Sequence, residues 1–156
     1  MVNNLPTTPL VIRLATPDDI STIEHLDSFS DSPTREIHRD MERYFGSVDP
    51  STHERTLIYL AERDGVAAAK AELMVPATDA ANAIGYIKRV VVHPDYRKQG
   101  LAHLLMQHII DLAHNELHLQ ALDLHTWEDN TSAIRLYESL GFSLQHSELY
   151  FRLPMP

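Results

Sequence analysis

The stretch with the clearest chemical potential joins an apolar run to a helical pattern through a short cationic turn. Val90–Val92 has the β-branched character of a buried strand, and Pro94 ends that strand. A helical pattern then starts within the turn Arg97-Lys98-Gln99-Gly100-Leu101-Ala102. The free N–H groups of a helix's first turn and the helix dipole both attract anions. The stretch therefore predicts a site for a phosphate-bearing ligand.

The residue types within the turn fit this interpretation. Gly100 has no Cβ, so the backbone can approach a ligand closely, and Ala102 keeps the next inward position small. Arg97 and Lys98 supply mobile cations for outlying phosphates. Residues 88–103 carry four Lys or Arg side chains against one Asp, in a chain whose formal net charge is −9. The local excess of cations falls where the phosphate ligand is expected.

These residues carry a resemblance to a known family. Arg97-x-x-Gly100-x-Ala102 matches the R/Q-x-x-G-x-G/A signature of the GNAT superfamily of N-acetyltransferases, and residues 90–96 look like its strand-to-loop lead-in. A second family-like block lies at 127–142. The resemblance is sharp between about 84 and 142. It implies acetyl-CoA as cofactor, bound by Val90, Val91, Val92, Arg97, Lys98, Gln99, Gly100, Leu101, Ala102 and Asn130.

The resemblance also implies roles for two residues of the second block. Asn130 matches the residue that bonds the pantetheine arm in relatives, although the same side chain is a good helix cap. Tyr137, within an LYE-x-LGF pattern, matches a tyrosine that donates a proton to the thiolate leaving group. The alternative for Tyr137 is a core role, because it shares a helical face with Leu136 and Leu140.

The group that takes a proton from the amine is left open by the sequence. Many relatives carry a carboxylate just before the apolar triplet, where this chain has Lys88 and Arg89. His125 is the candidate base, because it ends the next expected strand and a neutral imidazole titrates near neutral pH. Glu72, Glu128 and a chain of water molecules are the alternatives.

Metal chemistry is not expected. The chain has no cysteine, which excludes disulfides, thiolate zinc sites and a cysteine nucleophile. His114 and His118 are spaced i, i+4, but the intervening residues lack the metalloprotease pattern. We interpret them, with His103 and His108, as solvated side chains.

The order of expected elements predicts the fold. Strands are expected at 10–14, 56–62, 66–75, 84–92, 119–126, 142–145 and 149–153, and helices from Thr16, from Ser32, and at 100–114 and 132–140. Asp64-Gly65 is a hairpin signal, and Ile37, Met41, Tyr44 and Phe45 form the stripe of the second helix. The order predicts a mixed, mostly antiparallel sheet with helices on both faces, an α/β (α+β) class. The resemblance implies the GNAT-like acyl-CoA N-acyltransferase fold, with the central and following strands parallel and splayed. One domain is expected over 1–156, with a loose terminus at 1–9.

We therefore expect an N-acetyltransferase that moves acetyl from acetyl-CoA to a primary amine of a small molecule or peptide. Direct transfer in a ternary complex is expected, since no covalent nucleophile is evident. The alternative is a non-catalytic acyl-CoA-binding sensor or regulator, which would not need Tyr137. A DNA-associated regulator is a weaker third reading, and the negative net charge argues against it.

Net charge and hydropathy limit the kinds of partner that we expect. The acidic remainder of the chain favours a cationic acceptor, whereas Lys88 and Arg89 favour an acidic one, so the acceptor's charge is left open. No run is apolar enough to span a bilayer, and the first residues lack a leader pattern. A cytoplasmic protein without membrane or nucleic-acid partners is expected, and a homodimer is compatible with the sequence.

Overall fold

The structure is a computed structural model that describes residues 9–77 and 83–156. These residues divide into two compact units, Met1–Leu124 and His125–Pro156. The expected loose terminus at 1–9 lies outside the described residues except for Pro9, and the expectation of a single domain stays a prediction. In the described part of the chain, no helix has the length and apolar character needed to cross a membrane.

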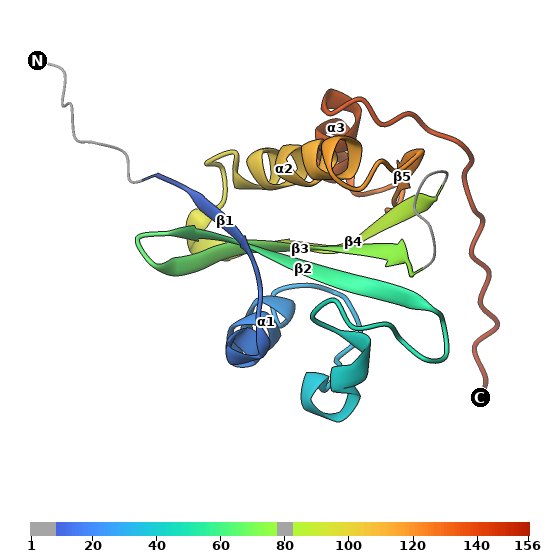
Figure 1. The fold of residues 1–156 in the computed structure, drawn as a ribbon. Coiled ribbons are helices and arrows are strands. Elements are labelled where there is room, and N and C mark those ends of the chain that lie inside the picture. Colours follow the sequence, from blue (N-terminus) through green and yellow to red (C-terminus); the bar gives the residue numbers. More distant parts are fainter. Residues whose placement is uncertain (1–8, 78–82) are drawn as a thin grey trace, which may run out of the picture. The chain divides into compact units, whose positions relative to one another are not determined.

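The first unit is built on a five-stranded sheet (Figure 1). Its strands run in the spatial order β1-β2-β3-β4-β5, with antiparallel pairs from β1 to β4 and a parallel pair between β4 and β5. The predicted mixed, mostly antiparallel sheet is confirmed. The strand bounds are β1 Val11–Leu14, β2 Glu54–Arg63, β3 Val66–Pro76, β4 Ile84–Val92 and β5 Ala121–Asp123.

Local sequence accounts for the first turn of the sheet and for the first helix. Asp64 and Gly65 join β2 to β3 with φ values of 55° and 75°, as a two-residue hairpin turn requires. The short 3-10 turn η1 (Pro17–Asp19) leads into α1 (Ile20–Asp27). The Asp19 carboxylate accepts the Thr16 N–H at 2.8 Å, which satisfies one free donor at the helix start. Both predictions made from these residues are confirmed.

Helices cover opposite faces of the sheet (Figure 1). On one face, the buried side chains of Ile23 and Leu26 from α1 join a core cluster with Ile58 and Leu60 of β2. On the other, α2 (Leu101–Asn115) buries one stripe made by Leu101, Leu105, Met106 and Ile109. The 3.6-residue period of these apolar positions produces that stripe. Helices on both faces are therefore confirmed for this unit.

The predicted second helix is wrong. The segment contains only η2 (Ile37–Arg43), a 3-10 stretch interrupted by a non-helical Asp40. Ile37 is buried and belongs to the core cluster under α1. Tyr44 and Phe45 also pack on this cluster, but Phe45 has a φ of 61° that turns the chain. The apolar spacing that suggested a helix therefore arises from side chains delivered to the core by an irregular segment.

The second unit contains the predicted helix but not the predicted final strands. Helix α3 (Thr131–Ser139) ends at Gly141, whose φ is 100°. The N–H groups of Gly141 and Phe142 close it by donating to the carbonyls of Glu138 and Tyr137. The predicted strands at 142–145 and 149–153 are wrong: residues 142–156 form no strand. A strand requires a hydrogen-bonded neighbour, and these residues have none in the described part of the chain.

The predicted strand at 119–126 is shorter than expected. Only Ala121–Asp123 pair with β4, through Ile84, Gly85 and Tyr86. Gly85 allows this approach, because a Cβ there would lie 2.7 Å from Leu119 and 2.9 Å from Leu122. Pairing, and not β propensity, sets the length of the strand.

Candidate active site

The bend between β4 and α2 is exposed and has an unusual backbone. The chain leaves β4, makes the 3-10 turn η3 (Pro94–Tyr96), and enters α2 after Gly100. Gly100 caps the helix with φ 73° and ψ 17°, and Lys98 is also left-handed with a φ of 64°. All residues from Arg97 to Gly100 are exposed. A Cβ added to Gly100 would meet no atom within 4 Å, so the space beside the helix start is open.

The first turn of α2 presents unsatisfied donors at this bend. The first helical hydrogen bond runs from the Leu104 N–H to the Gly100 carbonyl at 3.1 Å. No side chain caps the helix. In the described part of the chain, the N–H groups of Leu101, Ala102 and His103 have no acceptor. Three amides and the positive end of the helix dipole therefore face outward, which is the arrangement that binds anions.

An aromatic cluster holds the bend in position. The His93 ring lies between Phe29 and Tyr96, with centroid distances of 4.8 Å and 5.8 Å. His93 Nδ1 accepts the Asp95 N–H at 3.1 Å, and the His93 N–H donates to the Ala68 carbonyl at 2.8 Å. His93 thus fixes the end of β4 both to β3 and to the segment that follows α1.

The second half of β4 has a free edge. β5 pairs with β4 only at Ile84, Gly85 and Tyr86, and no other described strand pairs with that edge. The His93 N–H points to β3, and successive N–H groups of a strand point to alternate edges. The Val92 N–H therefore faces the free edge, where an extended ligand could pair with it. Val90 lies at a shift in the β3–β4 register, where this alternation is interrupted.

A group of charged side chains that contact one another lies on the α1 side of the sheet. This closed group of charges consists of Asp27, Arg35, Lys70 and Glu72. Glu72 is fully buried, and its two oxygens accept from Arg35 Nη1 and Lys70 Nζ, each at 2.8 Å. Arg35 Nη2 makes a further short contact with the same carboxylate. Burial alone would raise the pKa of Glu72, but the hydrogen bonds and charges of Arg35 and Lys70 lower it overall. Glu72 is therefore a poor candidate for the base.

Asn130 lies at the start of α3, in the second unit. Its Oδ1 accepts the Ala133 N–H at 3.3 Å, so the capping role is confirmed. Its amide N–H2 group has no acceptor in the described part of the chain and remains available to a ligand. The cofactor role of Asn130 stays a prediction.

Tyr137 is half-buried on α3 and its ring packs edge-on against Phe142, with centroids 6.0 Å apart. Burial raises the pKa of the Tyr137 hydroxyl. The hydroxyl is consequently protonated at neutral pH, as a proton donor must be. The packing and the proton-donor interpretations are compatible, because the ring packs while the hydroxyl can still donate.

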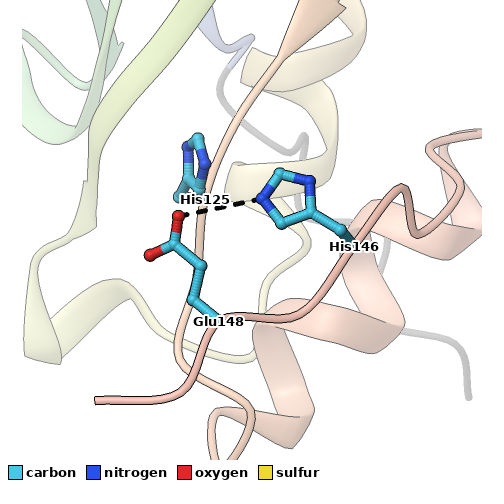
Figure 2. A group of neighbouring side chains, drawn as sticks. All are labelled: His125, His146 and Glu148. Carbon is cyan, nitrogen blue, oxygen red and sulfur yellow. Dashed lines mark ion pairs between the residues drawn. The ribbon is translucent and has the colours of Figure 1, made fainter. Parts of the chain in front are cut away.

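His125 is exposed and lies beside two other polar side chains of the same unit (Figure 2). Its ring centroid is 6.4 Å from that of His146, and His146 Nε2 lies 3.7 Å from Glu148 Oε1. One ligand atom from each of the three lies within 4.8 Å of the others, and such a donor set can hold a divalent metal. The sequence did not suggest this grouping, because about twenty residues separate His125 from His146. The role of His125 as base stays a prediction.

The comparisons with known proteins identify a family for most of the chain. The acetyltransferase (GNAT) family matches residues 19–142. The chain is 43% identical over 54 residues to the [ribosomal protein bS18]-alanine N-acetyltransferase of Escherichia coli, which covers 35% of this chain and 36% of that enzyme. The aligned segment thus spans about a third of that relative's length.

Solved structures share the fold over most of the chain. The Escherichia coli bS18-alanine N-acetyltransferase superposes with a TM-score of 0.71 at 24% identity, covering 88% of this chain and 80% of that one. The aminoglycoside N-acetyltransferase AAC(6')-Iy in complex with CoA gives a TM-score of 0.71 at 18% identity, covering 97% and 99%. The chain belongs to the GNAT family of acetyltransferases.

Proposed function

We propose that the protein is an acetyl-CoA-dependent N-acetyltransferase that transfers acetyl directly to a primary amine of a small molecule or peptide. The observation that carries this proposal is the first turn of α2, where three amides behind the left-handed Gly100 have no partner among the described residues. Arg97 and Lys98 stand exposed beside it. These donors fit a diphosphate, since backbone amides and mobile cations bind phosphate together.

The free edge of β4 supports the placement of the rest of the cofactor. An amide-containing arm laid along Val90–Val92 would pair with the outward N–H of Val92 as an added strand does. A backbone N–H at this edge could also stabilise negative charge that develops on the thioester oxygen. Bound acetyl-CoA would supply an activated acetyl group at this edge. The proposed role of Asn130 in binding the arm comes from the family resemblance.

The proton transfers are assigned to two residues of the second unit. Tyr137, which burial keeps protonated, is the proposed donor to the sulfur that leaves when the amine takes the acetyl group. His125 is the proposed acceptor of the proton that the amine loses, with Glu128 or a water chain as alternatives. A cytoplasmic location and a homodimer stay predictions from the sequence.

The substitution Tyr137→Phe tests whether the protein is an enzyme or a binding module. We expect acetyl-CoA to bind with unchanged affinity and kcat to fall about 100-fold or more, because the leaving sulfur loses its proton donor. Thiol release with a panel of amines measures turnover, and calorimetry measures binding. Tyr150→Phe is the matched control, since Tyr150 is an exposed tyrosine of the same unit.

Two other outcomes would change the assignment. Full activity of the Tyr137→Phe variant would remove Tyr137 from the mechanism. Tight binding of acetyl-CoA by the parent, with no thiol release for any amine, would favour the acyl-CoA-binding sensor instead.

A further inference from the structure

The closed group of charges on the α1 side of the sheet is neutral on its own. Lys70 Nζ contacts Asp27 Oδ1 at 2.7 Å and Glu72 Oε2 at 2.8 Å. Arg35 Nε contacts Asp27 Oδ2 at 3.0 Å and its guanidinium also binds Glu72. Two cations and two carboxylates therefore neutralise one another at a site where Lys70 and Glu72 are fully buried.

Strand β4 places two more cations, Lys88 and Arg89, beside this group, and Arg89 lies in a β-bulge. Lys88 pairs with Glu72 and Val91 pairs with Lys70, so Arg89 and Val90 together face the single residue Ala71. Arg89 has a φ of 52°, which is uncommon for a residue with a long side chain. The bulge re-aims Arg89 toward α1, where its Nη1 lies 3.8 Å from Asp27 Oδ2.

Neither of the added cations is fully satisfied. Arg89 Nη2 donates to the Pro33 carbonyl at 3.1 Å, but Arg89 Nη1 is buried and has no hydrogen-bond acceptor in the described part of the chain. Lys88 is half-buried and makes no hydrogen bond or ion pair with any described residue. Burial lowers the pKa of Lys88, in keeping with an ammonium that no described carboxylate contacts directly.

The excess of positive charge remains when the next acid is included. Glu54 of β2 is a further carboxylate whose charge acts on Lys88. Four cations then stand against three carboxylates around the bulge. A guanidinium with one N–H lacking an acceptor is incompletely compensated, and an anion bound to the exposed part of the Arg89 side chain would add compensation. Arg is well suited to this role, because its planar fork matches a carboxylate.

The excess of positive charge lies beside the part of β4 that the amine acceptor would approach. Lys88 and Arg89 immediately precede Val90–Val92, whose free edge is the proposed place of the thioester arm. The proposed phosphate site is at the start of α2, and α1 covers the opposite face of the sheet (Figure 1). An acceptor that approached β4 from the α1 side would avoid the cofactor and could reach Arg89 and Lys88, which are only partly buried.

We propose that Arg89 and Lys88 form an anion subsite for the acceptor, so that the enzyme prefers amines that carry a carboxylate close to the amino group. This inference rests on the proposed acetyltransferase function. The carboxylate could be the α-carboxylate of a free amino acid or the side chain of an acidic residue at a peptide's N-terminus. Both sources present the same chemistry to the guanidinium.

Matched acceptor pairs test the subsite and separate the two sources. One pair is alanine against alaninamide, and the other is a peptide amide beginning with Glu against the same peptide beginning with Gln. We expect kcat/KM to favour the acidic member of at least one pair by about 10- to 100-fold, as hydrogen bonds to charged groups do. The pair that shows the preference identifies the source.

Variants of the subsite provide the second arm of the experiment. Arg89→Met should reduce the preference to about twofold or less while the CoA affinity stays at the parent's value. Arg89→Glu should reverse it toward cationic acceptors, a gain that a misfolded variant does not show. Arg39→Met is the matched control, since Arg39 is an exposed arginine that pairs only with Glu36 among the described residues.

The outcomes distinguish failure of the subsite from failure of the function. Equal kcat/KM within both pairs, or an unchanged preference in Arg89→Met, overturns the anion subsite and leaves the transferase intact. If no amine releases thiol, the proposed function fails. The subsite is then judged by calorimetry of the same pairs on the CoA-loaded protein, where equal Kd values within both pairs overturn it.

Discussion

Cations gather in two places in the first unit, and the two places are built differently. At the bend before α2, Arg97 and Lys98 are exposed, and the amides beside them have no acceptor among the described residues. On the α1 side, Lys70 is buried and Arg35 is mostly covered, with 9% of its side chain exposed, and both contact carboxylates at 2.7–3.0 Å. The bend is suited to an incoming anion, whereas the buried pairs are already satisfied by the chain's own acids.

The difference separates binding from stability. Donors left open to solvent cost the fold little and remain available to a ligand. Buried ion pairs cost desolvation, and removal of one partner leaves an uncompensated charge in the interior. Substitutions at the bend should therefore change affinity for CoA, and substitutions in the buried pairs should change the free energy of unfolding.

The largest expected effect on stability is that of Glu72→Gln. The change leaves Arg35 and Lys70 facing a neutral amide, and we expect the free energy of unfolding to fall by about 3–5 kcal/mol. Urea denaturation measures it. Glu36→Gln is the control, because Glu36 forms an exposed pair with Arg39 and should change stability by no more than about 1 kcal/mol. Equal effects of the two variants would contradict the distinction.

The double substitution Arg97→Ala, Lys98→Ala should produce the opposite pattern. CoA affinity should fall about tenfold or more because two phosphate-facing cations are lost. The midpoint of urea denaturation should stay near the parent's, since both side chains are exposed and lie outside the ion pairs described here. Calorimetry at two salt concentrations checks the electrostatic origin, since the parent should lose more affinity in salt than the variant.

The smallest effect is expected at the Arg13–Asp19 pair, which is intermediate in exposure. The hydrogen bond from Arg13 lowers the pKa of Asp19 from 3.8 to about 2. Because the folded-state pKa lies below the ordinary value, the stabilisation is present above about pH 4 and is lost as pH falls toward 2. Asp19→Asn should lower the free energy of unfolding at pH 7. It should also reduce the loss of stability between about pH 4 and pH 2, as thermal unfolding at several pH values would record. An unchanged loss of stability at acid pH would rule out the Arg13–Asp19 pair as its source.

Much of the first unit could be predicted from the sequence because its signals are local. The apolar run between Ile84 and Val92 has the bounds of β4, and Asp64-Gly65 forms the expected hairpin turn. Helix α2 begins directly after Gly100, where the helical pattern was expected to start. Each of these features depends on neighbours within a few residues.

Features that depend on residues far apart in the sequence were either predicted wrongly or not predicted. The strands expected at 142–145 and 149–153 have β-rich composition, but composition does not provide a hydrogen-bonded neighbour. The buried charge group joins Asp27, Arg35 and Glu72 across long separations in sequence. One signal was available: Lys70 and Glu72 occupy alternate positions in an otherwise apolar strand, and so both point to the face that α1 covers.

The central claim is that the open bend before α2 binds the diphosphate of CoA, and a comparison of two glycine substitutions tests it most directly. Gly100 and Gly65 have nearly the same left-handed φ, 73° and 75°, and a Cβ at either would meet no atom within 4 Å. Gly100→Glu and Gly65→Glu therefore impose similar backbone strain, but only the first places an anion at the bend. Calorimetric titration with CoA should show affinity reduced about 100-fold or more in Gly100→Glu and nearly unchanged in Gly65→Glu. Equal CoA affinities in the two variants would contradict the claim.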